Sequence, residues 1–411
     1  MDFKEKLELY AKTAVRVGIN LKENQELNIS APIECIDLAR ALTKEAYRAG
    51  AKTVHVEYVD QQIALLRYLE APDSSFEDEY YSWLVDKSKS LLDRGSARIN
   101  ISAYDPNVFK DVDKERLNSW TKKGNIATQP LSIRMMNNEV QWLVISAPTD
   151  AVSTLIFPDV DVEKAKELHW EAIFDACRIN TKDPVKAWQD HKTLVRSKVK
   201  WLNEEDFASL QFTNSDKTTD LNIGLVTDHL WAGVGDTTLD GHEFIPNLPT
   251  EEVFSMPDKN NVNGVIRSTK PLNYHGTTID NFTLTFKDGA VVDYSAEVGY
   301  ETLKNLLESD EGAKRIGEVA LVPDDSPISK SGLTFFTTLY DENASCHLAF
   351  GRSYTCNIKG GTTMSQEELS SKGANTSIVH VDFMVGSADL NITGIKKDGT
   401  KIPVFVNGNW C

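Results

Sequence analysis

The 411-residue sequence has no long hydrophobic run. No apolar stretch approaches the roughly 20 residues that a membrane-spanning helix needs. The first residues, Met1–Lys6, are charged and lack the apolar centre of a signal peptide. We therefore expect a cytoplasmic protein that has no membrane partner.

Cysteine is scarce and scattered. An odd number of cysteines without any CxxC spacing argues against a disulfide framework and against a zinc ribbon. The five residues are Cys35, Cys177, Cys346, Cys356 and Cys411.

Basic residues are fewer than acidic residues. The chain has 44 Lys and Arg residues against 61 Asp and Glu residues, which gives a net charge of −17. Nucleic acids and anionic membranes attract basic surfaces, so neither is expected as a partner. The phosphate-binding patterns GxGxxG and GxxxxGK[ST] are missing after the expected strands, and we expect no nucleotide site.

The first half of the chain alternates between strand and helix patterns. Strands are expected at 26–30, 53–59, 98–102 and 141–146, with helix-length segments between them. This alternation is typical of an α/β domain with a largely parallel sheet. We expect this domain to serve as a scaffold or as a wall of the functional site.

The sequence pattern changes after a helical region at 162–203, which is interrupted near Pro184. Short alternating runs follow, separated by hairpin-type turns such as 287–289. They predict an α+β, strand-rich and mainly antiparallel domain with a helix at about 299–307. Because 411 residues exceed what one core usually serves, we expect an amino-terminal domain at 1–185 and a metal-binding catalytic domain at 186–411.

The segment 378–385 is the strongest candidate for chemistry. Side chains on a strand alternate between two faces, so His380 and Asp382 point the same way while Phe383 and Val385 point into a core. An imidazole beside a carboxylate on a rigid strand suits a divalent cation.

Further acids and a histidine occur upstream, each at the edge of an apolar run. A two-metal site needs about five or six oxygen and nitrogen ligands, and a Glu/Asp/His mixture without cysteine suits zinc, cobalt or manganese. The alternative is that these residues are unrelated surface acids that form no metal site, because acidic residues are abundant in this chain. The candidates are Glu251 or Glu252, Glu318, Glu342, His347, His380 and Asp382.

Other histidines and one thiol carry less weight. Cys346 and His347 face opposite ways if they lie on a strand, which disfavours a thiol nucleophile. A structural role is expected for His55, His229, His242 and His275.

Four segments resemble one bacterial family, in order along the chain. The family is that of the leucyl-type metallo-aminopeptidases, which includes aminopeptidase T, aminopeptidase S and PepS. The likeness covers essentially the whole chain. The segments are 247–254 (NLPTEEVF), 317–322 (GEVALV), 341–351 (DENASCHLAFG) and 380–384 (HVDFM).

The resemblance implies a cytoplasmic exopeptidase with two divalent metal ions per chain. It also implies a homodimer whose sites open onto an internal cavity, which would limit substrates to short peptides with a free amino terminus. Glu318 would bridge the two ions. The implied ligands are Glu252, Glu318, Glu342, His347, His380 and Asp382.

The resemblance further implies catalytic roles. Tyr354 matches a tyrosine beside the metals and would donate a hydrogen bond to the developing oxyanion. Glu251 is the first choice for the group that carries the proton to the leaving amine. The choice between Glu251 and Glu252 as ligand stays open, because neighbours on an extended segment face opposite ways.

Two other functions share these ligands. One is a metal-dependent amidase or deacylase that acts on small molecules and has no preference for a free α-amine. The other is a non-catalytic protein in which the acids hold a structural cation.

Overall fold

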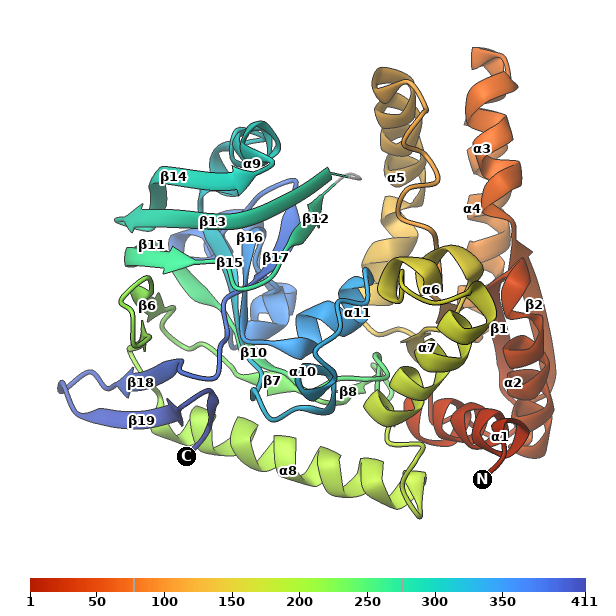
Figure 1. Cartoon of the computed structure of the whole chain (residues 1–411), viewed down its shortest axis with the longest axis horizontal. Coiled ribbons are helices and arrows are strands. Elements are labelled where there is room, and N and C mark those ends of the chain that lie inside the picture. Colours follow the sequence, from red (N-terminus) through yellow and green to blue (C-terminus); the bar gives the residue numbers. More distant parts are fainter. Residues whose placement is uncertain (77, 275–276) are drawn as a thin grey trace. The chain divides into compact units, whose positions relative to one another are not determined.

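The computed structural model describes residues 1–76, 78–274 and 277–411, without the side chains of residues 78–81. The described chain divides into two compact units (Figure 1). Unit 1 consists of Met1–Asp190, Gly235–Pro249 and Phe335–Leu339, and unit 2 of His191–Val234, Thr250–Thr334 and Tyr340–Cys411. The expected boundary between residues 185 and 186 stays a prediction.

Unit 1 contains a four-stranded parallel sheet with the order β2-β1-β3-β4. Its strands are β1 (Glu26–Pro32), β2 (Thr53–Val59), β3 (Ala97–Ile101) and β4 (Trp142–Ile145). The short antiparallel pair β8 (Asp236–Thr237) and β9 (Glu243–Phe244) also belongs to this unit. The parallel sheet confirms the α/β class predicted for the first half.

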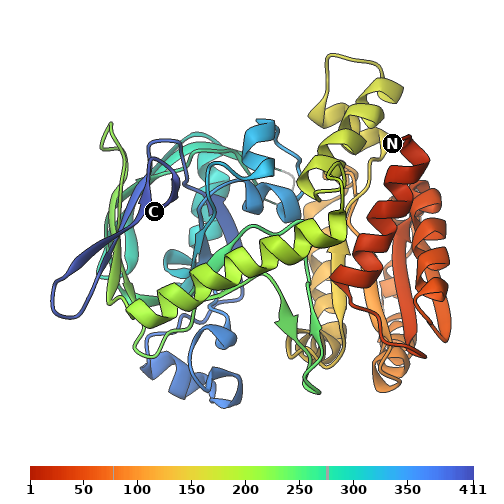
Figure 2. The same cartoon turned by 90° about the horizontal axis from the view of Figure 1, so that it is seen from below.

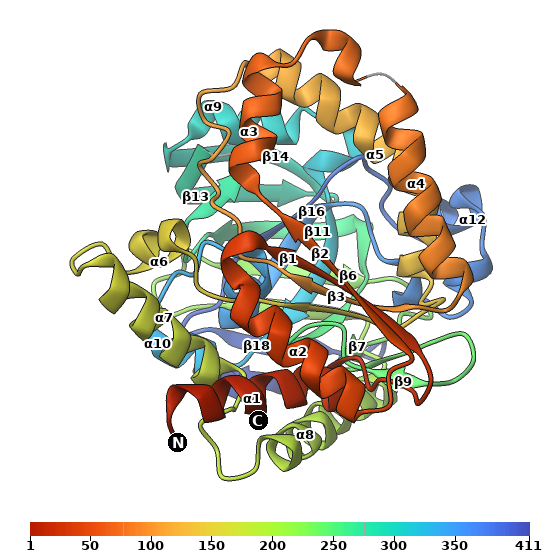
Figure 3. The ribbon, with the colours of Figure 1, turned by 90° about the vertical axis from the view of Figure 1, so that its right-hand side faces the viewer.

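Helices precede, connect and follow these strands. Helix α2 packs on β1 and β2, and α1 packs on α2 (Figure 3). Asp2 and Glu5 form a reciprocal capping box that fixes the start of α1. The helices are α1 (Phe3–Thr13, continued by a π-helical turn at Ala14–Gly18), α2 (Ile36–Arg48), α3 (Gln61–Glu70), α4 (Asp78–Asp93), α5 (Lys114–Met136), α6 (Asp150–Ile156) and α7 (Val162–Ala176).

Helix α8 (Pro184–Glu205) is a single unbroken helix that carries the chain from unit 1 into unit 2 (Figure 2). It begins at Pro184, where the sequence predicted an interruption. Proline suits the first turn of a helix, because its missing N–H is one that no helical carbonyl would receive. Among the described residues, no helix is both long and apolar enough to span a membrane.

Unit 2 is built on two antiparallel sheets. The larger has nine strands: β5 (Ser209–Thr213), β6 (Asp220–Leu225), β11 (Pro257–Arg267), β12 (Leu272–Tyr274), β13 (Thr277–Lys287), β14 (Ala290–Val298), β18 (Asn391–Ile395), β19 (Lys401–Val406) and β20 (Asn409–Trp410). The smaller has the order β17-β16-β15-β10-β7, with β7 (Ala232–Gly233), β10 (Val253–Ser255), β15 (Ile316–Leu321), β16 (His347–Gly351) and β17 (His380–Met384). The helices are α9 (Tyr300–Leu307), α10 (Pro327–Ser331), α12 (Gln366–Ser371) and α11 (Thr338–Asp341), whose first two residues belong to unit 1.

The two sheets of unit 2 pack against each other through aromatic side chains. The ring of Phe383 on β17 lies 5.6 Å from that of Phe282 on β13 and 4.4 Å from that of Phe350 on β16. Because strand side chains alternate, the residues next to Phe350 and Phe383 point to the opposite face of the small sheet. That face carries the candidate ligands.

Candidate metal centre

Strand register places two of the predicted carboxylates in one row across three strands. Ala349 on β16 is the pairing partner of Glu318 on β15 and also of Asp382 on β17. The three residues therefore form one row across the sheet, with a methyl group between the two acids. Close approach of like charges is costly unless a cation or a proton compensates for it.

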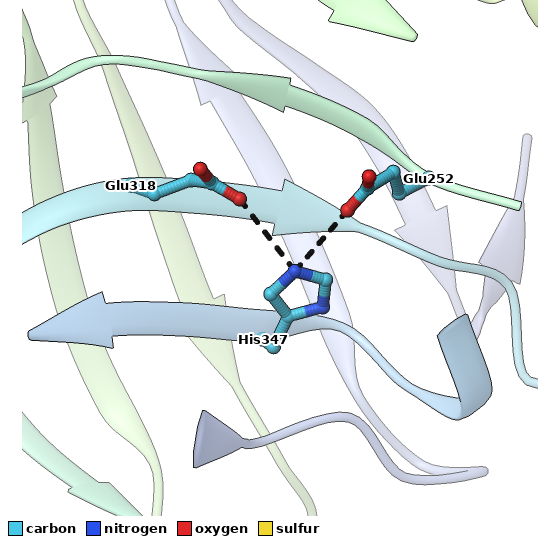
Figure 4. A group of neighbouring side chains, drawn as sticks. All are labelled: Glu252, Glu318 and His347. Carbon is cyan, nitrogen blue, oxygen red and sulfur yellow. Dashed lines mark ion pairs between the residues drawn. The ribbon is translucent and has the colours of Figure 1, made fainter. Parts of the chain in front are cut away.

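His347 brings two acids together on the same face. Its Nε2 atom lies 3.3 Å from Oε2 of Glu252 and 3.6 Å from Oε1 of Glu318 (Figure 4). Glu252 directly precedes β10, while Glu318 and His347 lie on β15 and β16. One potential ligand atom from each of these residues lies within 4.8 Å of the other two.

His380 extends this group along β17. Its Nε2 atom lies 3.7 Å from Oε2 of Glu318 and 3.6 Å from Oδ1 of Asp382. His380 and Asp382 share a face, as the alternation of the strand indicates. Glu318 thus stands between the two histidines and interacts with both.

Backbone carbonyls fix the orientation of both imidazoles. His347 Nδ1 lies 3.1 Å from the carbonyl oxygen of Ser345, and His380 Nδ1 lies 2.7 Å from that of Arg352. A carbonyl only accepts hydrogen bonds, so Nδ1 carries the proton in each ring. In the neutral form, Nε2 then presents its lone pair to the acids, which is the state of a metal-binding histidine.

Glu342 and Tyr354 border the group. Glu342 begins a 3-10 turn at Glu342–Ala344, which packs on β17. The ring of Tyr354 lies 4.6 Å from the ring of His380 and 6.1 Å from that of Phe254. The Tyr354 side chain is 37% exposed, so part of it faces solvent although its hydroxyl end is surrounded by protein.

Glu251 is placed differently from Glu252. Its N–H donates a 2.7 Å hydrogen bond to Oδ1 of Asn343, and its Oε2 atom lies 3.6 Å from Nε2 of His191. His191 also lies 2.8 Å from the carbonyl oxygen of Thr250. His191 could not be predicted as a neighbour of Glu251 from the sequence, because a histidine in the middle of a helix carries no pattern that points to a site.

Burial and mutual repulsion shift the pKa values of the acids. Burial raises the pKa of Glu318, and the negative charges of Asp382 and Glu252 raise it further against the opposing effect of His347. Burial and the charges of Glu252 and Asp382 raise the pKa of Glu342 well above its usual value. The metal-free site therefore holds protons that a cation would replace.

The same group of acids also raises the pKa values of His347 and Tyr354. Burial alone would lower the pKa of His347, but Glu252 and Glu318 hold it well above its usual value. Burial, with the charges of Glu318 and Asp382, raises the pKa of Tyr354 well above its usual value. The phenol keeps its proton at neutral pH and is available as a hydrogen-bond donor.

Two buried oxygen atoms decide whether this group suits cations. Oε2 of Glu318 and Oδ1 of Asp382 are inaccessible to solvent and have no hydrogen-bond partner in the described part of the chain. Buried carboxylate oxygens without a partner are costly, and oxygen ligands beside correctly oriented imidazoles are what zinc, cobalt and manganese accept. The residues present fit a divalent metal.

The other described histidines have structural partners. His229 lies within 3.0 Å of the carbonyl oxygen of Val226, and His242 within 2.6 Å of that of Asn20. His55 lies 3.7 Å from Glu26 at the sheet of unit 1. His275 lies outside the described residues.

Comparison with known proteins assigns the family. The family model described as thermophilic metalloprotease (M29) matches residues 3–410. The chain belongs to this family. It is 45% identical to Aminopeptidase 2 of Geobacillus stearothermophilus and 45% identical to Aminopeptidase AmpS of Bacillus subtilis (strain 168), each over 100% of the chain and 98% or 99% of the relative.

A solved structure supports the same assignment. Wild-type AmpT from Thermus thermophilus superposes with a TM-score of 0.93 at 38% identity, covering 100% of both chains. The fold predicted from the sequence is thereby confirmed. The prediction of a metallo-aminopeptidase related to aminopeptidase T and PepS is confirmed at the level of the family, and the comparisons do not favour the amidase or the structural-metal reading.

Proposed function

We propose that this protein removes amino-terminal residues from short peptides with the help of two divalent cations. The observation that carries the proposal is the convergence of Glu252, Glu318 and His347, next to two buried carboxylate oxygens that lack partners. His380 and Asp382 continue the group, and Glu342 borders it. The residues that would hold the cations are Glu252, Glu318, Glu342, His347, His380 and Asp382.

The number of acids supports two cations rather than one. Four carboxylates carry four negative charges, whereas a single divalent ion supplies two positive charges and a metal-binding histidine is neutral. Glu318 interacts with both His347 and His380, so it is the residue best placed to be shared between two sites. When bound, the cations would lower the pKa of a water molecule and polarise the scissile carbonyl.

Tyr354 would stabilise the charge that develops on the substrate. Its raised pKa keeps the hydroxyl protonated, and its ring is in contact with His380. A protonated phenol at the edge of the group donates a hydrogen bond to the oxyanion of the tetrahedral intermediate, which strengthens as negative charge accumulates there.

Glu251 would carry a proton from the water to the leaving amine. It is buried and adjacent in sequence to Glu252, yet its carboxylate is directed to His191 rather than to the group around His347. A carboxylate that is not shared with a cation keeps the basicity that proton transfer requires. The acids of the group also suit the positively charged α-amine of a substrate, which explains a preference for the amino terminus.

Four finer features belong to this proposal. We infer a homodimer, a location in the cytoplasm, and zinc, cobalt or manganese as the metal. We also infer that the catalytic domain begins at residue 186. Light scattering of the purified enzyme tests the dimer, and a mass corresponding to one 45.9 kDa chain would contradict it.

The decisive experiment combines activity with metal counting. Hydrolysis of leucine p-nitroanilide is measured before chelation, after chelation, and after single metals are returned, while mass spectrometry counts the metal in the same samples. Activity that disappears on chelation and returns with about two ions per chain supports the proposal. A folded, metal-loaded sample that cleaves no peptide with a free amine would contradict it.

A second comparison separates an aminopeptidase from an amidase. Leucinamide has a free α-amine, and N-acetyl-leucinamide presents the same amide bond without one. We expect cleavage of the first compound only. Equal cleavage of both would show that the α-amine is not recognised.

A further inference from the structure

The two faces of the parallel sheet in unit 1 differ sharply. One face carries Leu27, Ile29 and Ile99, all fully buried. The other face of the same strands carries Asn28 and Ser30 on β1 and Arg98 on β3, and strand pairing places Asn28 beside Arg98. Parallel sheets covered by helices on both sides are normally apolar on both faces. A polar face beneath helices therefore needs a function.

The connections between the strands show which helices cover the polar face. The chain steps from β1 to β2 in one direction across the sheet, and from β2 to β3 and on to β4 in the other. Since such crossovers are right-handed, α2 lies on one face, and α4 and α5 lie on the opposite one. Helices α4 and α5 pack against each other and appear as a pair in Figure 3.

A cavity of about 630 Å³ lies between this polar face and the helix pair. Its volume is in the range of sites that enclose small organic ligands. Its floor is the sheet, and its roof combines leucine and methionine side chains with the hydroxyl groups of Ser88, Thr128 and Ser132. The apolar roof residues are Leu84, Leu91 and Leu92 from α4, with Leu131, Met135 and Met136 from α5.

The floor offers polar groups that the protein itself leaves unused. Within the described chain, the side-chain amides of Asn28 and Asn100 make no hydrogen bond, although Asn28 is only 9% exposed. The amide atoms of Asn28 and Asn100 are not among the described side-chain atoms that are closed off from solvent without a partner, so they are accessible from the cavity. Both amides can donate and accept hydrogen bonds.

The charge of the cavity is positive. Arg98 forms no ion pair or hydrogen bond through its guanidinium group among the residues that the structure describes. Glu57, the acid that lines the cavity, is already paired with Lys87. A free guanidinium presents a planar pair of donors that matches a carboxylate.

We propose that this cavity binds a small carboxylate with an apolar body. Arg98 holds the carboxylate, Asn28 and Asn100 complete its hydrogen bonds, and the apolar body lies against α4 and α5. Fatty acids and apolar peptides with a free carboxyl terminus share this chemistry. The site lies wholly within unit 1, and the proposal does not depend on the function proposed for the metal centre.

Calorimetric titration of the metal-loaded enzyme tests the proposal with three probes. Decanoate represents the fatty acids. N-acetyl-Leu-Leu represents the peptides, and it has no free amino terminus at which an aminopeptidase could cleave it. Decan-1-ol has an apolar body without a carboxylate. We expect saturable binding of decanoate or of N-acetyl-Leu-Leu, and the probe that binds identifies the source of the ligand.

Variants of one arginine show where the carboxylate binds. Arg98→Gln should weaken binding of the carboxylate at least about tenfold, which corresponds to about 1.4 kcal/mol, and Arg98→Lys should give an intermediate loss. Arg40→Gln removes the same charge from an exposed position on α2 and should bind like the wild type. The affinity for decan-1-ol should be the same in Arg98→Gln and in the wild type, because this probe has no carboxylate.

Two results would overturn the proposal. The first is the absence of binding of both carboxylates at millimolar concentration. The second is equal affinity of Arg98→Gln and the wild type for the carboxylate that binds. Arg98 is solvent-exposed, so its replacement is not expected to affect folding, and circular dichroism verifies this.

Discussion

Individual side chains at the metal centre are held by their neighbours before any ligand arrives. The imidazoles of His347 and His380 are each fixed through Nδ1 by a backbone carbonyl. Their tautomer and ring orientation are therefore set by the fold, which lowers the entropic cost of binding a cation. The structure thus prepares the nitrogen ligands, while the crowded acids supply the charge that attracts a cation.

The substitution Tyr354→Phe separates catalysis from metal binding. The hydroxyl is expected to stabilise the oxyanion only in the transition state, so its loss should lower kcat by about 10²–10³ and leave KM nearly unchanged. The metal content should equal that of the wild type. Steady-state kinetics with leucine p-nitroanilide and mass spectrometry of the same samples measure both quantities.

Replacement of another aromatic residue provides the control. Phe254 lies beside the Tyr354 ring and has no hydroxyl, so Phe254→Leu alters packing at the same place without removing a donor. It should retain most of its activity. If Tyr354→Phe were as active as the wild type, tyrosine would have no part in the chemistry.

Secondary structure elements carried most of the information that the sequence could give. The period-2 pattern of β17 predicted that His380 and Asp382 share a face, and the structure places their side chains 3.6 Å apart. Alternation describes one strand at a time, however. The register that places Glu318 opposite Ala349, and Ala349 opposite Asp382, arises from pairing between distant segments and leaves no local pattern.

The choice between Glu251 and Glu252 shows the same limit. Strand β10 begins at Val253, so neither acid lies within the strand whose alternation could decide between them. The structure directs Glu252 to His347 and Glu251 to His191 of α8. The cavity in unit 1 was missed for a related reason, because Asn28 and Arg98 are neighbours only through the strand order.

Ala349 offers a test of how strand register builds the centre. Its methyl group separates Glu318 from Asp382, so Ala349→Leu should place a branched side chain where the cations are proposed to bind. We expect the loss of most bound metal and of activity. The side chain is fully buried, and overpacking of this kind also costs about 1–3 kcal/mol of stability.

Two controls make the Ala349 result specific. Ala349→Ser keeps a small side chain and should retain metal and activity. Circular dichroism and a denaturant titration establish that Ala349→Leu is folded at the assay temperature. A folded Ala349→Leu protein with a full complement of metal would show that the row from Glu318 to Asp382 does not border the cations.

At the scale of the whole molecule, the net charge of −17 makes cation binding and stability interdependent. The metal centre concentrates part of that charge in a buried position. Without metal, folding must either protonate these acids or accept their repulsion, and with metal the charge is compensated. A cation that binds the folded chain but not the unfolded chain therefore raises the free energy of unfolding.

This coupling predicts how the stability of the metal-free enzyme depends on pH. Glu318 and Glu342 have pKa values raised above 4.5 in the folded chain, so the folded state binds more protons than the unfolded state once pH exceeds about 4.5. His347 has a pKa raised above 6.5, and its stabilising contribution is present at low pH and lost as pH rises through the raised value. All three groups therefore make the metal-free enzyme less stable as pH increases.

The metal-loaded enzyme should not lose stability in this way, because metal binding displaces these protons and becomes tighter as pH rises. The difference in Tm between metal-loaded and chelated enzyme should hence widen from about pH 5 to about pH 8. Differential scanning calorimetry at several pH values measures it. Glu318→Gln removes one of the coupled acids and should narrow the difference at the upper end of the range. A difference that stays constant with pH would mean that metal binding does not displace the protons held by the buried acids and by His347.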